Sequence, residues 1–214
     1  MTRYAIYHCP DGAQGDWGAG WLGWDIRSGE THPPARPELV KRPSKYGFHA
    51  TLKAPFRLAE ARGETGLKEA VARLAQGLAP VSFALDVQRI GSFFALVPQR
   101  RSEQLELLAA ACVEELDGYR APLTEAELAR RNPARLSPHQ AALLSRWGYP
   151  YVMDEFRFHI TLTGPVAKGD VERVATDVTR EAASVTGAHR LDSICLSGER
   201  DDGRFELIER FALG

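Results

Sequence analysis

Hydrophobic positions follow two periods along this chain. Alternating or continuously apolar runs are typical of strands, and they occupy residues 3–8, 21–24, 48–53, 81–90, 92–98, 156–163, 189–197 and 204–213. Apolar residues at three- and four-residue spacing are typical of amphipathic helices, and they occupy residues 67–78, 105–116 and 171–185. Thr124 and Ser137 each precede a Glu or Gln by three residues, as in a capping box. The pattern therefore predicts a mixed chain of strands and five helices.

Two segments lack either period and are predicted to be loops. Residues 11–20 are rich in glycine, and residues 30–44 contain four prolines, which disfavour a helix or a central strand. The proline-rich segment is a candidate active-site loop or lid. The intervening run Trp21–Trp24 fits a short strand, core packing or a ligand wall, and we favour packing because large aromatic side chains dominate protein cores.

The runs at 48–53 and 156–163 contain nearly the same octapeptide. Residues 48–55 read FHATLKAP and residues 158–165 read FHITLTGP, so five residue types recur at an offset of 110. An amphipathic helix and then two strand-like runs follow each copy. Matching modules of strand, helix and hairpin indicate two duplicated lobes.

Each octapeptide carries a histidine and a threonine two positions apart. Residues i and i+2 of a strand project from the same face, about 7 Å apart. His49 with Thr51, and His159 with Thr161, therefore each present an imidazole and a hydroxyl together. If the two lobes meet across a pseudo-two-fold axis, these four side chains line a cleft of the size of a phosphate.

This combination of residue types suits displacement at phosphorus. The attacking and leaving oxygens lie roughly in line, so a base and an acid are best placed on opposite sides of the phosphorus. Histidine can serve in either role near pH 7. Threonine hydroxyls can donate hydrogen bonds to the nonbridging oxygens and support the charge of the transition state.

Positive charge is local in this chain. The 214 residues carry a formal net charge of −1, with 44% hydrophobic and 26% charged residues, so the total charge indicates neither bulk nucleic acid nor an anionic membrane as a partner. Between residues 36 and 57, however, six basic residues accompany a single acidic one. Lys45 and Lys53 flank His49 in this segment and are candidate anion contacts.

The sequence also indicates a compartment. Residues 1–8 lack the apolar core of a secretory signal, and no stretch approaches the ~18 apolar residues of a membrane span. Cys9, Cys112 and Cys195 are odd in number and widely spaced, which fits neither a disulfide framework nor a Cys-x-x-Cys metal site. We expect a cytoplasmic protein with structural cysteines.

The two histidine-containing strings resemble those of a known family. Residues 45–56, KYGFHATLKAPF, and residues 158–165 are similar to the paired motifs of the 2H phosphoesterase superfamily, in its branch associated with phosphonate-metabolism operons. The resemblance implies a single bilobal α+β domain with antiparallel sheets around a central cleft and outer helices. The lobes would span about 1–98 and about 151–214, joined by a helical connection over about 99–150.

The resemblance further implies roles for site residues and a class of substrate. His49 and His159 are expected to be the general acid and base, Thr51 and Thr161 to bind phosphate, and no metal or other cofactor to take part. The implied activity is that of a metal-independent cyclic phosphodiesterase acting on a small anionic substrate. The phosphonate branch suggests a ribose 1,2-cyclic phosphate that carries a 5-phosphate.

Three residues belong to the branch-like string rather than to the superfamily core. Lys45, Tyr46 and Lys53 are therefore expected to contact the substrate. The sequence does not decide whether residues 101–147 cap the cleft, brace the lobes or form a dimer surface, nor which histidine is the base.

Three other interpretations stay open. Similar 2H proteins act on RNA ends with 2′,3′-cyclic phosphates or ligate RNA, but an RNA substrate calls for an extended basic and aromatic track, and the basic cluster here is compact. A noncatalytic nucleotide- or RNA-binding module would keep the cleft without turnover. A zinc site could use His49 and His159, although the chain contains no His-x-His, His-Glu-x-x-His or Cys-x-x-Cys motif.

Overall fold

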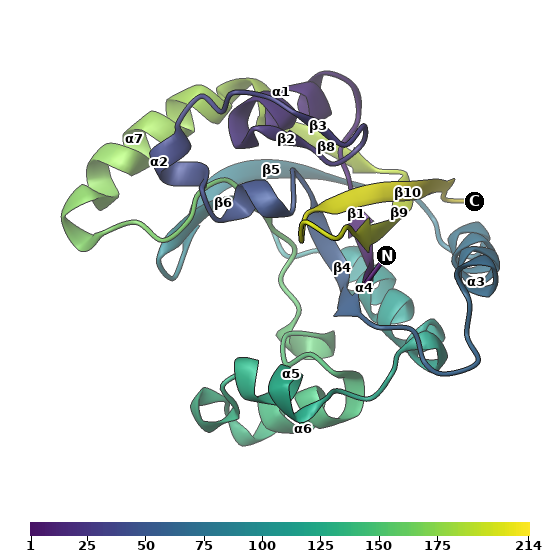
Figure 1. Cartoon of the computed structure of the whole chain (residues 1–214). Coiled ribbons are helices and arrows are strands. Elements are labelled where there is room, and N and C mark those ends of the chain that lie inside the picture. The colour runs from purple at the N-terminus through teal and green to yellow at the C-terminus, as the bar shows by residue number, and fades with distance from the viewer.

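One curled, eight-stranded antiparallel sheet organises the molecule (Figure 1). The computed structural model describes all 214 residues. The strand order is β10-β9-β1-β4-β7-β6-β5-β8. These strands are β1 (Tyr4–His8), β4 (Ala50–Phe56), β5 (Val81–Ile90), β6 (Phe93–Pro98), β7 (Ile160–Thr161), β8 (Gly187–Leu191), β9 (Ser193–Glu199) and β10 (Phe205–Ala212). A separate two-stranded ribbon pairs β2 (Trp24–Asp25) with β3 (Glu30–Thr31).

Seven α-helices surround the sheet in three groups (Figure 1). The helices are α1 (Gly12–Leu22), α2 (Pro37–Val40), α3 (Glu64–Gln76), α4 (Glu103–Glu115), α5 (Glu125–Arg130), α6 (Pro138–Trp147) and α7 (Val171–Glu181). Helices α1, α2 and α7 lie at one end of the molecule, α3 and α4 at the other, and α5 with α6 lie apart below the sheet. The predicted α+β class is confirmed.

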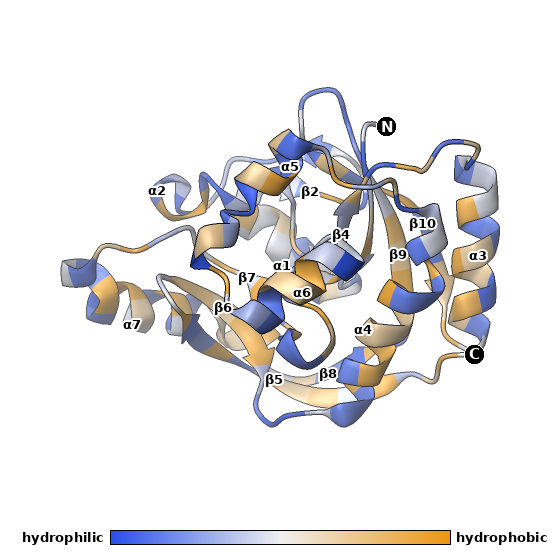
Figure 2. Ribbon diagram, turned by 90° about the horizontal axis from the view of Figure 1, so that it is seen from below, coloured by the Kyte–Doolittle hydropathy of each residue, from blue (hydrophilic) through white to orange (hydrophobic).

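The predicted amphipathic helices place their apolar stripes in one core. In α3, Leu67 and Val71 are fully buried, and in α7 Val174 and Val178 are buried. Figure 2 shows apolar and polar residues alternating along α3, as expected for a helix with one face on the sheet. Each fully buried aliphatic side chain stabilises the fold by about 1.5–3 kcal/mol, which fixes these helices despite their modest length.

The sheet interleaves segments from both halves of the chain. Strand β4, from the first repeat, lies between β1 and β7, and β7 lies between β4 and the first repeat's β6. The predicted run 189–197 is not one strand, and that prediction is wrong. The run breaks at Asp192, so β8 pairs with β5 at one edge of the sheet while β9 pairs with β1 and β10.

Helix α1 replaces the loop predicted over residues 11–20, which was wrong. Its interior glycines each cost about 0.5–1 kcal/mol relative to alanine in a helix, and the sequence signal is correspondingly weak. Gly18 packs so closely on the Phe48 ring that a Cβ atom would overlap it. Trp21 is 3% exposed and donates an indole hydrogen bond to the Leu162 carbonyl at 2.8 Å. Tertiary packing thus selects the helix and confirms that this tryptophan belongs to the core.

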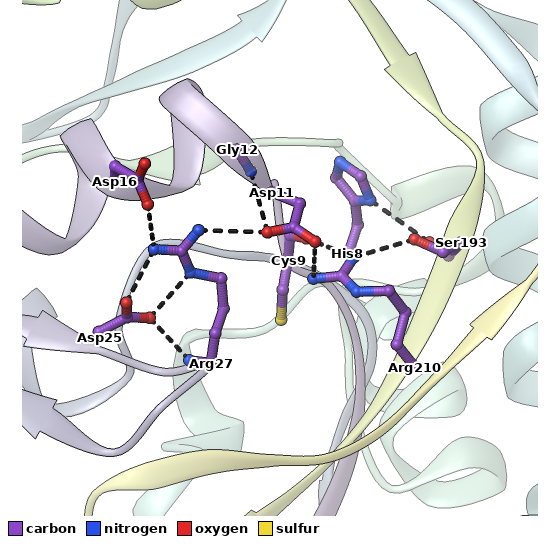
Figure 3. A network of polar contacts seen from close by, with 9 residues as sticks. All are labelled: His8, Cys9, Asp11, Gly12, Asp16, Asp25, Arg27, Ser193 and Arg210. Carbon is purple, nitrogen blue, oxygen red and sulfur yellow. Dashed lines mark hydrogen bonds and ion pairs between the residues drawn. The ribbon is translucent and has the colours of Figure 1, made fainter.

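A charged network holds the start of α1 in place (Figure 3). Asp11 caps the helix by accepting a hydrogen bond from the Gly12 amide at 2.9 Å. The Arg27 guanidinium reaches Asp25, Asp16 and Asp11 at 2.8, 2.7 and 3.2 Å. These contacts join the helix to the ribbon formed by β2 and β3.

Two other predictions needed adjustment. The proline-rich segment 30–44 contains β3, the single helical turn α2 and a 3-10 turn at Pro43–Lys45. Pro37 and Pro43 occupy first positions of these turns, where a missing N–H costs nothing. The strand predicted at 156–163 is reduced to β7, two residues long. The lid function remains a prediction.

No helix of the protein combines the length and the apolar character that a membrane crossing requires.

Candidate active site

The two repeated motifs meet at the centre of the sheet. Strands β4 and β7 pair antiparallel with Ala50 opposite Ile160. This register places His49 opposite Thr161, and Thr51 opposite His159. Ala50 and Ile160 are fully buried on the other face. The four predicted side chains are therefore adjacent, each histidine across from the threonine of the other repeat.

The two histidines occupy diagonal positions in this arrangement. Diagonal neighbours on an antiparallel pair are about 7–8 Å apart, whereas directly opposite Cβ atoms are about 4.5–5.5 Å apart. A phosphoryl group can sit between two imidazoles at the wider spacing, with one nitrogen on each side of it. The register of a single residue pair thus creates the two-sided geometry that in-line displacement needs.

Backbone carbonyls set the same tautomer in both histidines. His49 Nδ1 lies 3.0 Å from the Gly47 carbonyl, and His159 Nδ1 lies 2.8 Å from the Arg157 carbonyl. A carbonyl can only accept, so each Nδ1 carries a proton and donates it. Each Nε2 is then the nitrogen available for chemistry. His49 Nε2 lies 3.3 Å from Thr51 Oγ1, within the cleft.

The site lies between two cavities that share part of their lining. One, of about 400 Å³, is lined by His49 and Thr161. The other, of about 600 Å³, is lined by Thr51 and His159. Residues at the turn between β5 and β6 line both. A ligand centred on the four residues can therefore extend to either side.

Burial lowers the pKa of both histidines. The pKa of His49 falls to about 4, mainly because burial penalises the imidazolium and secondarily because a charge on His159 would repel it. Burial also lowers the pKa of His159. Both rings are therefore neutral in the empty cleft near pH 7. An anionic phosphodiester bound between them would raise both pKa values, since it favours the imidazolium.

The three residues of the branch-like string occupy different places. Tyr46 lines the cavity with His49, their ring centroids being 6.4 Å apart. Lys45 is exposed at the end of its 3-10 turn and lines neither cavity. Lys53 is 3% exposed, and its Nζ donates to the Val113 carbonyl at 3.0 Å.

Asp117 completes the contacts of Lys53, with Oδ1 3.4 Å from Nζ. Burial lowers the pKa of Lys53 to about 8. The ammonium is therefore bound to the end of α4 rather than presented to the histidines. Substrate contact by Lys45, Tyr46 and Lys53 remains a prediction.

Three residues that sequence reasoning did not assign to the site lie beside it. The Tyr7 ring packs on His49, with 3.9 Å between ring centroids. Arg42 lines the cavity of His49, and Arg157 lines that of His159. Both arginines are exposed, and neither forms an ion pair. From the sequence, Tyr7 is a possible cleft residue for which core packing is favoured, and its contact with His49 depends on the pairing of β1 with β4. Arg42 lies in the basic segment.

Comparison with known proteins places this site in a family. A family model described as "Protein of unknown function (DUF1045)" matches residues 51–206, which include Thr51, His159 and Thr161. The chain belongs to the DUF1045 family.

The DUF1045 chain is similar to two curated proteins, both named ribose 1,5-bisphosphate phosphokinase PhnN. It is 41% identical to the one from Janthinobacterium sp. (strain Marseille) over 188 residues, covering 82% of this chain and 42% of that protein. It is 35% identical to the one from Laribacter hongkongensis (strain HLHK9) over 198 residues, covering 87% of this chain and 45% of that protein. The DUF1045 chain thus spans less than half the length of the curated relatives that it matches.

Among solved structures, the DUF1045 chain is similar to E. coli LigT complexed with NADP⁺. The superposition has a TM-score of 0.50 at 14% identity and covers 99% of this chain and 97% of LigT. The fold is therefore LigT-like, which confirms the fold predicted from the paired motifs. No three His, Cys, Asp or Glu side chains gather closely enough to hold a metal ion. Independence of a metal stays a prediction.

Proposed function

We propose that this protein is a metal-independent cyclic phosphodiesterase that opens a small anionic cyclic phosphate in the cytoplasm. The observation that carries the proposal is the register of β4 and β7. This register places the two histidines diagonally across one cleft, each opposite a threonine. Both histidines have the same tautomer, with the proton on Nδ1. The LigT-like fold supports a phosphoesterase.

The proposed reaction uses one histidine on each side of the phosphorus. The neutral imidazole takes a proton from water through Nε2, and the water oxygen forms a bond to phosphorus. The ring P–O bond breaks on the opposite side, and the protonated second imidazole gives its proton to the departing oxygen. The products are a phosphomonoester and a free hydroxyl on the same molecule. The anionic substrate helps to protonate the second histidine by raising its pKa.

The threonines and the free arginines support the charge on the phosphoryl oxygens. Thr51 and Thr161 flank the space between the histidines, so their hydroxyls can donate to the two nonbridging oxygens. Arg42 and Arg157 enter from the two cavities without carboxylate partners. Their positive charge favours binding of an anion.

The relatives' name supports a specific substrate. Both relatives are named as kinases of ribose 1,5-bisphosphate, and the part of each that resembles this chain is less than half of the whole. A 5-phosphorylated ribose 1,2-cyclic phosphate, opened at its P–O2 bond, yields ribose 1,5-bisphosphate. The proposed ring opening would thus produce the compound that the relatives' name says they phosphorylate. This relation, together with the phosphonate association of the motifs, favours the phosphoribosyl substrate.

A 2′,3′-cyclic phosphate at an RNA end is the second candidate. Tyr149 and Tyr151 form an edge-to-face pair with ring centroids 5.6 Å apart, and both line the cavity of His159. Aromatic side chains at this position could stack on a nucleobase. This pair is the specific observation that favours a nucleotide substrate.

Phosphorus NMR on a substrate panel tests the proposal. EDTA-treated protein would be incubated with 5-phosphoribosyl 1,2-cyclic phosphate, with 2′,3′-cyclic AMP and with an RNA that ends in a 2′,3′-cyclic phosphate. We expect ring opening of the first substrate in the presence of the chelator, and its loss in His49→Ala and in His159→Ala. His139→Ala, which removes an exposed histidine outside the site, is the matched control and should retain activity.

The other outcomes separate the alternatives. Preference for the RNA would favour the second candidate. Binding without turnover of any substrate would indicate a noncatalytic module. Activity that needs added metal would mean that the histidines are metal ligands rather than an acid and a base.

A further inference from the structure

A third cavity, next to the catalytic cleft, is strongly basic. It has a volume of about 220 Å³ and is lined by residues of β4, α4, α5 and α6. In the view of Figure 2 these helices lie in front of β4. Its lining contains one acidic residue, Glu127, and six basic ones: Arg3, Lys53, Arg57, Arg120, Arg130 and Arg131. Basic side chains therefore gather at this cavity, although the chain as a whole has a formal net charge of −1.

Four of these cations already have carboxylate partners. Arg57 pairs with Glu127 at 3.0 Å, and Arg3 pairs with Glu199 at 2.6 Å. Lys53 and Arg120 share Asp117, at 3.4 and 2.8 Å. The two groups on Asp117 still leave one positive charge in excess.

Arg130 and Arg131 have no carboxylate partner. Arg130 donates from Nε to the Ala126 carbonyl at 3.3 Å, and the Arg131 guanidinium lies over the Tyr149 ring, 4.8 Å from its centroid. Both side chains line the cavity. Two guanidinium groups therefore remain free to bind an anion, and guanidinium binds phosphate oxygens in a bidentate manner.

A local network holds α5 in position. Thr124 and Glu127 form a capping box at the start of α5. Glu127 also binds Arg57, which follows the end of β4, at 3.0 and 3.1 Å. The helix is thereby tied to the strand that carries Thr51, and its last turn presents the two free arginines to the cavity.

The basic cavity adjoins both cavities of the catalytic cleft, because it shares lining residues with each of them. Tyr46 lines the basic cavity and the cavity of His49, and Tyr149 lines the basic cavity and the cavity of His159. A ligand whose cyclic phosphate lies between the histidines can therefore extend a second group toward Arg130 and Arg131.

We propose that this cavity binds a second phosphate of the substrate, a terminal phosphomonoester, through Arg130 and Arg131. The proposal rests on the cyclic phosphodiesterase function proposed above and gives the helical connection a role in substrate selection. A dianionic phosphomonoester matches the uncompensated positive charge, and its three terminal oxygens can accept hydrogen bonds from both guanidinium groups.

Two substrates that differ only in the 5-phosphate test this proposal. Steady-state kinetics would compare ribose 1,2-cyclic phosphate with and without that group. We expect the wild-type protein to have the higher kcat/KM on the phosphorylated substrate. In the Arg130→Gln/Arg131→Gln variant this preference should fall ~10- to 100-fold, mainly through KM, because hydrogen bonds to charged groups are lost. Glutamine keeps part of the aliphatic stem and removes the guanidinium that lies over Tyr149.

Arg135→Ala provides the matched control. Arg135 is exposed on the same connection and does not line the cavity, so both kcat/KM values should be unchanged. An unaltered substrate preference in the double variant would overturn the proposal. Equal losses on both substrates would also overturn it, because they would indicate a structural role.

A binding measurement separates this proposal from the catalytic one. If the wild-type protein opens neither substrate, the proposed function fails, and calorimetric titration with ribose 5-phosphate then tests the cavity alone. Binding that is at least tenfold weaker in the double variant than in wild type would support a phosphate site. Equal binding by both proteins would overturn it.

Discussion

At the scale of single residues, His49 and His159 are distinguished from the other histidines by a shared local geometry. Each donates its Nδ1 proton to the carbonyl two residues earlier and presents Nε2 to the cleft. The sequence predicted the pair from its repeated context. It could not predict the carbonyl partners, because these depend on how the chain bends just before each strand.

The lowered histidine pKa values predict an acidic optimum for kcat/KM. In the free enzyme, kcat/KM should rise with pH around the pKa of the histidine that acts as base, and fall around the pKa of the histidine that acts as acid. Both of these pKa values lie below 6.5. The profile of kcat should be shifted to higher pH, because the bound anion raises both pKa values. Initial rates measured from pH 4 to 9 check this expectation, and a kcat/KM optimum above pH 7 would contradict it.

Replacing either cleft threonine should reduce the rate without unfolding the protein. Thr51→Val and Thr161→Val keep the shape of the side chain but remove the hydroxyl donor opposite a histidine. We expect each to lower kcat by a factor that corresponds to about 2–4 kcal/mol. Thr186→Val, directly before β8 and outside both cavities, is a control that should leave kcat unchanged. Equal effects of all three variants would contradict the phosphate-binding role.

At the scale of elements, α1 braces the strands that carry the motifs. It packs on Phe48, directly before His49, and it binds the carbonyl of Leu162, directly after Thr161. Because α1 is rich in glycine, its sequence is typical of a loop rather than of a helix. Glycine lowers helix propensity, yet here its small size permits the close approach that places both motifs.

Two glycine substitutions in α1 separate these effects. Gly18→Ala should lower the free energy of unfolding by about 1–3 kcal/mol, because the new methyl group overlaps Phe48. Gly20→Ala should raise it by about 0.5–1 kcal/mol, because nothing lies within 4 Å of the new Cβ and alanine favours the helix. Urea unfolding checks both. Equal effects at the two positions would contradict the packing role of α1.

At the scale of the whole molecule, a buried histidine pair links strands that are far apart in the sheet. His8 of β1 and His189 of β8 lie with their Nε2 atoms 2.8 Å apart, although four strands separate β1 from β8. The curl of the sheet brings the two together. Burial lowers the pKa of His8 to about 3 and that of His189 to about 4.

This pair predicts a loss of stability in acid. Unfolded histidine has a pKa near 6.5, so the unfolded chain binds more protons than the native one as pH falls from about 6.5 toward the folded values. The free energy of unfolding should therefore decrease with falling pH, by up to about 1.4 kcal/mol per pH unit for each proton taken up. Unfolding measured between pH 7.5 and 4.5 checks this.

His189→Phe tests the assignment of the acid sensitivity. Phenylalanine fits among Phe83 and Phe158, which surround the pair, and removes one titrating group. The slope of stability against pH should become shallower by about one proton. A slope identical to that of the wild type would show that other groups cause the acid effect.

The sequence by itself determined the elements whose signals are local. The hydrophobic period predicted α3, α4 and α7, and the capping boxes predicted the starts of α5 and α6. The repeated octapeptide identified all four residues of the cleft. These signals suffice because each depends on neighbours within a few positions along the chain.

Only the tertiary structure decided the features that depend on distant contacts. The pairing of Ala50 with Ile160 set each histidine opposite the other repeat's threonine. Long-range packing selected α1 and divided the last apolar run between β8 and β9. The basic cavity likewise joins residues from β4 and the helical connection. Such contacts join positions many residues apart, so the periodicity of a short segment cannot predict them.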